Sequence, residues 1–461
     1  MLQKLPRNRV PLPTVLLALV LAACMSSPPP PSPTAVGVVT PPPATATPTP
    51  SPAPTPTPSP SPTPTPSPSP SPSPSPSPSP TPADQAEAHA VQLQATLEAQ
   101  LVLRRIPGAA ALVDFPDGSR WSGVAGLASI DPAQPVTQDT GFVVGSITKT
   151  FVAACVMQLV EEGVLELEAP LARWLPDYPR ARRITLRQLL NHTSGVHNYF
   201  EHPLYESLVF GRPAHEWTPE EVLEEFRSPP YFAPGNGFYY SNTGFILLGL
   251  VIEEATGASL DEELGRRFLG PMGLEDTHLQ TADGGQPGWA HGYLRAQGGH
   301  RHVTNEDDLR PSTSAATVAW AAGAMVSTAD DIADWAQALY SGDVLAEESL
   351  AQLTDYSYSP HPRGTYGLGT RTRVVQGARA YGHTGSLRGY IAAMWRFPRE
   401  EVTVVILTNV GRYDGNRLAD ALVTLALDGD AVPPPDTSPL PITPPPPDTS
   451  PLPTQSPTSA P

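Results

Sequence analysis

Lys149 is the residue whose chemistry stands out first, because Lys4 and Lys149 are the only lysines in a chain with 28 lysines and arginines. Lys149 follows Ser146 by three positions, in the run Gly-Ser-Ile-Thr-Lys-Thr. Arginine, with a pKa above about 12, keeps its proton, whereas a desolvated lysine can lose its proton and act as a base. The pair predicts proton transfer at Ser146, although compositional drift towards arginine would leave the same lysine.

The segment after Ser146 predicts a buried helix over residues 147–162. Side chains at positions i and i+3 share a helix face, so Lys149 can reach the Ser146 hydroxyl. Unpaired N–H groups at the helix N-terminus favour negative charge there. A capping serine followed by an ordinary helix lysine is the alternative, but an unpaired lysine would be costly in a helix that is apolar nearly all round. The apolar residues are Ile147, Phe151, Val152, Val156, Leu159 and Val160.

Two further motifs follow along the chain, and each is weak when taken alone. Tyr240-Ser241-Asn242 precedes an apolar run at 245–248. A tyrosine near cations can approach a phenolate and shuttle protons, and an asparagine amide can bind a substrate carbonyl. His383-Thr384-Gly385 ends a predicted strand. Threonine can bind a substrate carboxylate, and glycine leaves the strand edge open for an extended substrate.

Patterns on both sides of these motifs predict the elements that position them. A helix over 84–105 precedes strands at 109–115 and 119–127, and the body ends with strands at 378–384, 389–397 and 402–409 and a helix at 417–427. The middle of the body is mostly helical. We predict an α/β (α+β) fold, in which a five-stranded antiparallel sheet is flanked by helices and the middle forms a helical lobe.

The three motifs, in this order, resemble those of the penicillin-recognising serine hydrolases. The most similar branch contains class C β-lactamases and D-alanyl-D-alanine carboxypeptidases, together with esterases and D-amino-peptide hydrolases. Two more segments look like the family, at 189–195 (LLNHTSG) and 327–331 (STADD). The resemblance implies a β-lactamase/transpeptidase-like fold that works without a cofactor or a metal ion.

The resemblance also implies roles for individual residues. Ser146 would be the acylated nucleophile, with Lys149 and Tyr240 as its acid/base pair. The N–H groups of Ser146 and Ser386 would form the oxyanion hole. Because no glutamate loop with a class A pattern stands out, deacylation would use Tyr240.

Substrate-binding roles follow in the same way. Asn242 would bind the substrate amide, and His383, Thr384 and Gly385 would meet the substrate at the strand. His383 replaces the lysine of many members; it keeps a donor near the substrate carboxylate but is only partly charged near neutral pH. Arg388 and Arg417 are further candidates for a carboxylate partner, with surface salt bridges as the alternative for both.

The expected activity is therefore hydrolysis of amide or ester bonds through an acyl-enzyme. A D-alanyl-D-alanine carboxypeptidase-like peptidase acting on peptidoglycan stem peptides is the leading hypothesis, and a class C-type β-lactamase or an esterase is the alternative. A non-catalytic cell-wall-binding module is the alternative from another class. It predicts damaged motifs, whereas all three motifs are intact.

The ends of the chain differ in composition from the body. Residues 1–24 are typical of a lipoprotein signal peptide, with an apolar run that ends in a lipobox-like Leu-Ala-Ala before Cys24. Of 61 prolines, 26 lie between Ser26 and Pro82 and 13 follow Ala431. We therefore expect a disordered linker at 25–83, a hydrolase domain at 84–431 and a disordered tail at 432–461. The lipidated Cys24 would anchor the protein to the bacterial membrane, outside the cytoplasm.

The remaining patterns bear on partners. The net charge of −17 and the lack of a basic block argue against nucleic-acid binding, and we expect a monomer. Cys155 is expected to be a small core residue, so no disulfide framework is predicted. His291, His300 and His302 lack accompanying ligands and are interpreted as loop histidines. His192 and His197 are expected to shape a turn beside the site. Four aromatic residues would line or support the site, or simply pack: Tyr231, Phe232, Phe238 and Tyr239.

Overall fold

The computed structural model describes residues 82–280, 288–296, 299–302, 313–357, 365–411 and 414–428. The predictions for Cys24, the N-terminal linker and the C-terminal tail lie outside these residues, as do the side chains of His300 and His302.

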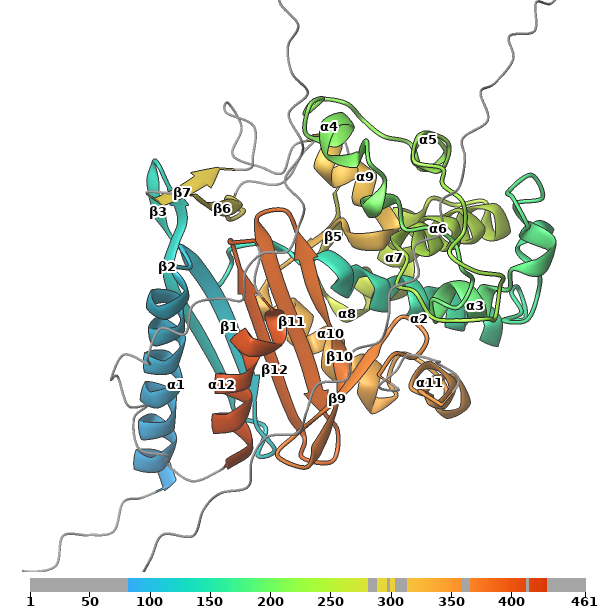
Figure 1. Ribbon diagram of the computed structural model, residues 1–461. Helices are drawn as coiled ribbons and strands as arrows, with labels where there is room; N and C mark the ends of the chain where they lie inside the picture. The colour runs from blue at the N-terminus through green and yellow to red at the C-terminus, as the bar shows by residue number, and fades with distance from the viewer. Residues whose placement is uncertain are drawn as a thin grey trace, which may run out of the picture. The chain divides into compact units, whose positions relative to one another are not determined.

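The main sheet has seven antiparallel strands in the order β3-β2-β1-β12-β11-β10-β9 (Figure 1). Early and late strands do form one sheet, since β1 pairs directly with β12. The predicted count of five strands is wrong because the sheet gains β3 at one edge and β9 at the other. Both are short, and β3 is wholly exposed while β9 begins Arg-Thr-Arg, so neither has the apolar pattern of a buried strand. The bounds are β1 Gly108–Asp114, β2 Arg120–Ile130, β3 Ala133–Pro135, β9 Arg371–Val375, β10 Ala378–Leu387, β11 Tyr390–Phe397 and β12 Val402–Thr408.

Helices cover both faces of the sheet. The terminal helices α1 (Pro82–Arg104) and α12 (Gly415–Asp428) lie side by side on one face, and α10 (Ala329–Ser341) packs on the other (Figure 1). Successive residues of β1 accordingly join two different apolar clusters: Ala111 packs with the terminal helices and Leu112 with the helical lobe. Strands buried on both faces appear as continuous apolar runs, which made β1, β11 and β12 predictable.

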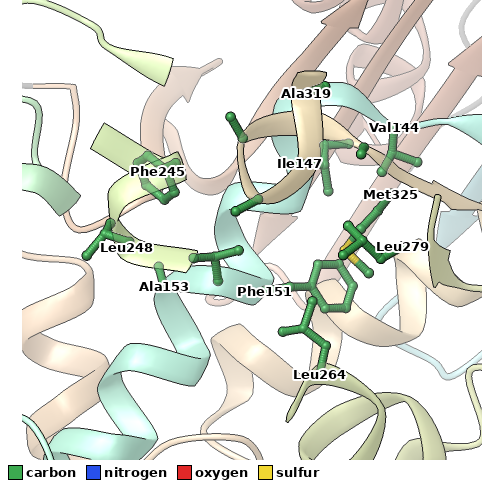
Figure 2. Packing of buried hydrophobic residues seen from close by; sticks show 14 of the residues in the cluster. Val144, Ile147, Phe151, Ala153, Phe245, Leu248, Leu264, Leu279, Ala319 and Met325 are labelled. Atoms are coloured by element: carbon green, nitrogen blue, oxygen red, sulfur yellow. The ribbon is translucent and has the colours of Figure 1, made fainter. Parts of the chain in front are cut away.

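The helical lobe surrounds α2 (Thr148–Glu161), which is buried along most of its length. Ile147, Phe151 and Ala153 belong to one buried apolar cluster with residues of the neighbouring helices, which include Phe245 of α6 (Asn242–Thr256) and Ala319 of α9 (Thr313–Gly323) (Figure 2). The lobe's other helices are α3 Leu186–Leu190, α4 Tyr205–Val209, α5 Pro219–Glu225, α7 Leu260–Leu264, α8 Gly270–Met272 and α11 Glu347–Leu353. Two small sheets complete the described part, one made of β4 Phe142–Val143, β8 Met325–Ser327 and β5 His278–Leu279, and the other of β6 Tyr293–Ala296 and β7 Gly299–His302.

Candidate active site

Ser146 lies in a 3-10 turn, Gly145–Ile147, directly before α2 and against strand β10. Two glycines permit this contact. A Cβ on Gly145, whose φ is +53°, would lie 2.6 Å from the backbone nitrogen of Ser386, and one on Gly385 would lie 1.8 Å from the carbonyl oxygen of Val144. The turn and the strand therefore meet backbone to backbone. This brings the main-chain N–H groups of Ser146 and Ser386, the predicted oxyanion hole, to neighbouring positions.

Lys149 is fully buried, and its amine contacts three oxygen atoms. Its Nζ lies 3.1 Å from Ser146 Oγ, 2.8 Å from Asn242 Oδ1 and 2.5 Å from the carbonyl oxygen of Ala322. Burial, reinforced by the positive charge of Arg371, holds the pKa of Lys149 well below its usual value. A neutral amine has two N–H donors and one lone pair. Since the Asn242 and Ala322 oxygens can only accept, the lone pair faces Ser146.

Tyr240 completes the group around the nucleophile, because its hydroxyl donates a hydrogen bond to Ser146 Oγ at 3.0 Å. Burial raises the pKa of Tyr240, and this effect outweighs the opposing influence of Arg371 and of the bond to Ser146. Tyr240 is therefore a protonated phenol near neutral pH, which differs from the expected approach to a phenolate. Lys149 is the better base of the two residues, and Tyr240 is a proton donor.

His383 does not lie where the sequence motif suggested. Its ring is fully buried: Nδ1 lies 2.6 Å from the carbonyl oxygen of Thr384, and Nε2 lies 3.2 Å from the hydroxyl of Tyr366. Burial, together with the charges of Arg371 and Lys149, holds the pKa of His383 well below its usual value. The imidazole is thus a neutral, buried support beside Tyr366 and Tyr240, and it is not among the residues that line the cavity. Thr384 and Gly385 do line the cavity.

Arg371, which no sequence motif indicated, supplies a cation to the cavity. It is the first residue of β9, and it pairs with Gly382 just before the His-Thr-Gly motif. Its guanidinium carbon lies 5.5 Å from the centroid of the Tyr240 ring and 5.6 Å from that of Tyr366. Within the parts of the chain that the structure describes, no carboxylate lies within ion-pairing distance of Arg371, so an anion in the cavity could meet it directly.

The two arginines considered from the sequence have other positions. Arg388 lines the cavity, but its guanidinium lies 3.5 Å from a Glu206 carboxylate oxygen and 3.7 Å from the centroid of the Phe210 ring. Arg417 is exposed on α12 and is not among the residues that line the cavity. The ion-pair alternative therefore describes Arg388, and neither residue matches Arg371 as a free cation near Ser146.

The cavity has a volume of about 510 Å³ and follows the unpaired part of β10. Strand β9 pairs with β10 only as far as Gly382, which leaves Thr384 to Leu387 open towards the helical lobe. The lining includes the four candidate site residues Ser146, Tyr240, Asn242 and Arg371. It also includes aromatic and charged side chains, which are Phe200, Tyr205, Phe210, Glu206, Arg388 and Asp414.

The predicted supporting residues form the wall behind the motif loop. His192 Nδ1 accepts a hydrogen bond from the Ser241 N–H at 3.2 Å, and its ring centroid lies 4.2 Å from that of Tyr240. The carbonyl oxygen of His197 accepts from Thr243 Oγ1 at 2.7 Å. Tyr231 and Tyr239 both donate to Glu201, so they support the site without lining it. His291 is buried, and the residues that the structure describes hold no group of three or more histidines, cysteines or acids arranged to bind a metal ion.

Comparison with known proteins defines the class. Residues 85–428 match the family model described as Beta-lactamase. The chain therefore belongs to this family and has the corresponding mixed α/β fold.

Individual relatives have different activities. The chain is 34% identical to Esterase EstB of Burkholderia gladioli over 206 residues, which is 42% of this chain and 52% of EstB. It is 27% identical to Penicillin-binding protein 4 of Amycolatopsis lactamdurans over 342 residues, covering 69% of this chain and 84% of that protein. The structure of a D-stereospecific amidohydrolase from Streptomyces sp. aligns with a TM-score of 0.63 at 30% identity, covering 73% of this chain and 97% of that one. The chain thus spans about half of EstB and most of the other two.

No single helix in the described ranges is long and apolar enough to cross a membrane. Only α6 and the following segment Leu260–Met272, bent by 80° against each other, reach that threshold as a pair. Most of α6 is buried in the core of the lobe.

Proposed function

We propose that this protein cleaves peptides that end in a D-amino acid with a free carboxylate, as a D-alanyl-D-alanine carboxypeptidase-like enzyme. The observation that carries the proposal is Arg371. It places an arginine with no carboxylate partner among the described residues in the same cavity as Ser146. Arginine stays charged and can bind a carboxylate through two parallel hydrogen bonds. Thr384 also lines this cavity and could offer its hydroxyl to the same carboxylate.

The chemistry begins at Ser146. The substrate lies along the open part of β10, and its scissile carbonyl oxygen points at the N–H groups of Ser146 and Ser386. Ser146 Oγ attacks the carbonyl carbon while its proton moves to the lone pair of Lys149. The resulting ammonium has three N–H donors for three acceptors: Ser146 Oγ, Asn242 Oδ1 and the Ala322 carbonyl oxygen. The two main-chain N–H groups stabilise the oxyanion of the tetrahedral intermediate.

Tyr240 then completes acylation. Its hydroxyl gives a proton to the leaving amine as the C–N bond breaks, and the Lys149 ammonium returns a proton to Tyr240. Ser146 is left as an ester, while Lys149 is again neutral. Deacylation repeats these steps in reverse, with water in the place of the amine. The Lys149–Tyr240 pair accepts a proton from water while the oxygen of that water adds to the ester carbonyl. The pair then returns the proton to Ser146 Oγ as the ester bond breaks and the acid leaves.

A matched pair of substrates tests the proposal. We expect the wild-type enzyme to cleave a peptide ending in D-Ala-D-Ala, and to cleave the same peptide with a C-terminal amide ~10- to 100-fold less efficiently, because a desolvated arginine–carboxylate pair contributes about 1.4–3 kcal/mol. Ser146→Ala should abolish both reactions and the labelling by a fluorescent penicillin.

Other outcomes identify the alternatives. Rapid turnover of the penicillin would indicate a β-lactamase, and turnover of a nitrophenyl ester without any D-peptide cleavage would indicate an esterase, for which the likeness to EstB argues. If none of these substrates reacts in a Ser146-dependent way, the non-catalytic wall-binding module would be the better explanation.

We also propose that the enzyme works outside the cytoplasm, attached to the membrane by a lipid on Cys24. The lipobox-like sequence before Cys24 and the proline-rich segment after it support this location. Metabolic labelling with a tritiated fatty acid should mark the wild type but not Cys24→Ala. Equal labelling of the two proteins would contradict the anchor.

A further inference from the structure

A chain of hydrogen bonds connects the buried amine of Lys149 to an exposed carboxylate, Glu201, through two asparagine side chains. Lys149 Nζ donates to Asn242 Oδ1 at 2.8 Å, and Asn242 Nδ2 donates to Asn198 Oδ1 at 3.1 Å. Asn198 Nδ2 then donates to Glu201 Oε1 at 3.2 Å. Neither Asn198 nor Glu201 lines the cavity. Of the two asparagines, only Asn242 belongs to a sequence motif.

The groups at the two ends of this hydrogen-bond chain, Glu201 and Lys149, determine how each asparagine side chain is oriented. A carboxylate can only accept, so Asn198 must turn its Nδ2 towards Glu201 and its oxygen towards Asn242. The main-chain N–H of Asn242, which can only donate, also binds this oxygen at 3.1 Å and imposes the same orientation. Asn242 must then turn its own Nδ2 towards Asn198, which leaves Oδ1 for Lys149. Only one arrangement of donors and acceptors satisfies every member of the chain.

Glu201 is held as an acceptor by its other contacts. Tyr231 donates to Glu201 Oε2 at 2.7 Å and Tyr239 donates to the same oxygen at 3.1 Å. Burial raises the pKa of Glu201, but the bonds from Tyr231, Asn198 and Tyr239 outweigh that effect and lower it below the usual value. The carboxylate is therefore ionised near neutral pH. Through Tyr239 it also holds the residue next to Tyr240.

We propose that Asn198 and Glu201 are positioning residues for catalysis, which hold the Asn242 carboxamide so that the lone pair of Lys149 faces Ser146. With the carboxamide reversed, Nδ2 would donate to that lone pair, and Lys149 would turn an N–H towards the serine that it must deprotonate. Substrate contacts would remain, but the base would be lost. The inference rests on the proposed serine chemistry and does not depend on which substrate is cleaved.

The groups around each end of the hydrogen-bond chain determine how the acylation rate should depend on pH. Lys149 is faced by Tyr240, whose ring centroid lies 5.1 Å from Nζ, and it lies within electrostatic reach of Arg371, His192 and His383. Loss of the Asn242 oxygen as an acceptor removes a contact that stabilises the Lys149 ammonium. The pKa of Lys149 would then fall further. The ascending limb of the acylation rate against pH should therefore move to lower pH, while the plateau drops.

The titratable groups that act on Glu201 are Tyr231, Tyr239 and His197. His197 stacks on Tyr231 with ring centroids 4.8 Å apart. Because these contacts hold the pKa of Glu201 below its usual value, and a protonated His197 would favour the ionised carboxylate further, acidification to about pH 6 does not remove Glu201 as an acceptor.

The test uses the burst of acylation by a chromogenic ester in the full chain. We expect Asn198→Ala to lower the acylation rate ~10- to 100-fold and Glu201→Ala about 10-fold, with KM within about twofold of wild type, because small displacements of a catalytic group have effects of this size. Glu201→Gln still offers an oxygen to Asn198, so it should retain most of the rate. Glu225→Ala, a change at an exposed acid of α5, is the matched control.

Several results would overturn the inference. These are an unchanged rate and pH profile in Asn198→Ala and Glu201→Ala, a rise in KM alone, or equal losses in Glu201→Gln and Glu201→Ala. If Asn198→Ala fails to fold, the variants at the exposed Glu201 carry the test. D-peptides that are not cleaved would refute the proposed substrate but not this inference. A wild type that no ester, penicillin or peptide acylates would refute both.

Discussion

The two basic residues of the active site, Lys149 and Arg371, both lie near the Tyr240 ring, at 5.1 Å and 5.5 Å from its centroid, and they differ in what surrounds them. Lys149 is fully buried among three oxygen atoms, all of which its neutral amine can satisfy. Arg371 is half-buried, faces the cavity and contacts the rings of Tyr240 and Tyr366. The lysine site is built for an amine that gains and loses a proton. The arginine site is built for a permanent charge that awaits an anion.

This difference agrees with the composition of the chain. Apart from Lys4 near the N-terminus, every basic residue other than histidine is an arginine except Lys149, for which we propose a role in proton transfer. The positive charge of Arg371 also helps to lower the pKa of Lys149, so the anion site contributes to the base as well. Binding of a substrate carboxylate at Arg371 would weaken that contribution, which couples the two regions electrostatically.

Exchanging the base in the lysine site should have the largest effect. Lys149→Arg keeps a long basic side chain, but a guanidinium stays protonated and has no lone pair to accept the serine proton at neutral pH, so acylation of Ser146 should fall ~10³-fold or more. The rate of labelling by a fluorescent penicillin measures this loss, and thermal unfolding of the variant verifies that it is folded. A labelling rate near that of wild type would refute the role of Lys149 in proton transfer.

Removing the cation from the arginine site should have a smaller effect that depends on the substrate. Arg371→Gln should raise KM ~10- to 100-fold for peptides with a free carboxylate and leave KM for a neutral ester nearly unchanged. Because the variant also removes a positive charge near Lys149, the pKa of Lys149 should rise and the ascending limb for ester acylation should move to higher pH. Steady-state kinetics on both substrates at several pH values measures the two effects.

Two control variants make this result specific. Arg371→Lys keeps the charge and should lose less affinity for the carboxylate than Arg371→Gln. Arg379→Gln changes an exposed arginine of β10 and should behave as wild type. Equal losses for the ester and the peptide in Arg371→Gln would show that Arg371 supports the structure rather than binding the carboxylate.

The lysine site and the arginine site also differ in how much of each could be predicted from the sequence. Ser146 and Lys149 share one helix turn, so a three-residue spacing was enough to predict their contact. Arg371 reaches the cavity only because the register of β9 places it opposite Gly382, and β9 itself is too short and polar to be recognised. Asn198 meets Asn242 across 44 residues, through the packing of a loop without periodicity. Contacts of this kind depend on tertiary structure and leave no local pattern.

The same distinction applies to the fold and to His383. The central strands β1, β11 and β12 were predictable because both of their faces are buried, whereas the edge strands β3 and β9 were not. The motif predicted that His383 ends a strand, but the alternation of side chains decides which face its ring meets. Its neighbour Thr384 lines the cavity, whereas the ring of His383 is buried on the helical-lobe side against Tyr366, with its centroid 6.4 Å from that of Tyr240.

The smallest predicted effect concerns the pH dependence of the free energy of unfolding, and it compares two buried histidines of the site, His192 and His383. Burial lowers the pKa of both His192 and His383 well below the usual value. The charge of Lys149 is the next cause for His192, and that of Arg371 is the next cause for His383. Unfolded chains bind protons below about pH 6.5, and the folded protein does not until a much lower pH. The free energy of unfolding should therefore fall as the pH decreases from 6.5, by ~1.4 kcal/mol per pH unit for each histidine.

Urea unfolding at pH 7 and pH 5.5 measures this dependence, and replacing one histidine at a time separates the two sites. His383→Asn removes one of these groups, so its unfolding free energy should depend on pH less steeply in this range, by ~1.4 kcal/mol per pH unit. In Arg371→Gln, the pKa of His383 should rise more than that of His192, and nuclear magnetic resonance titration of the ring protons would detect the difference. Equal shifts of both rings would mean that Arg371 acts on the whole site, and that its charge does not distinguish the two regions.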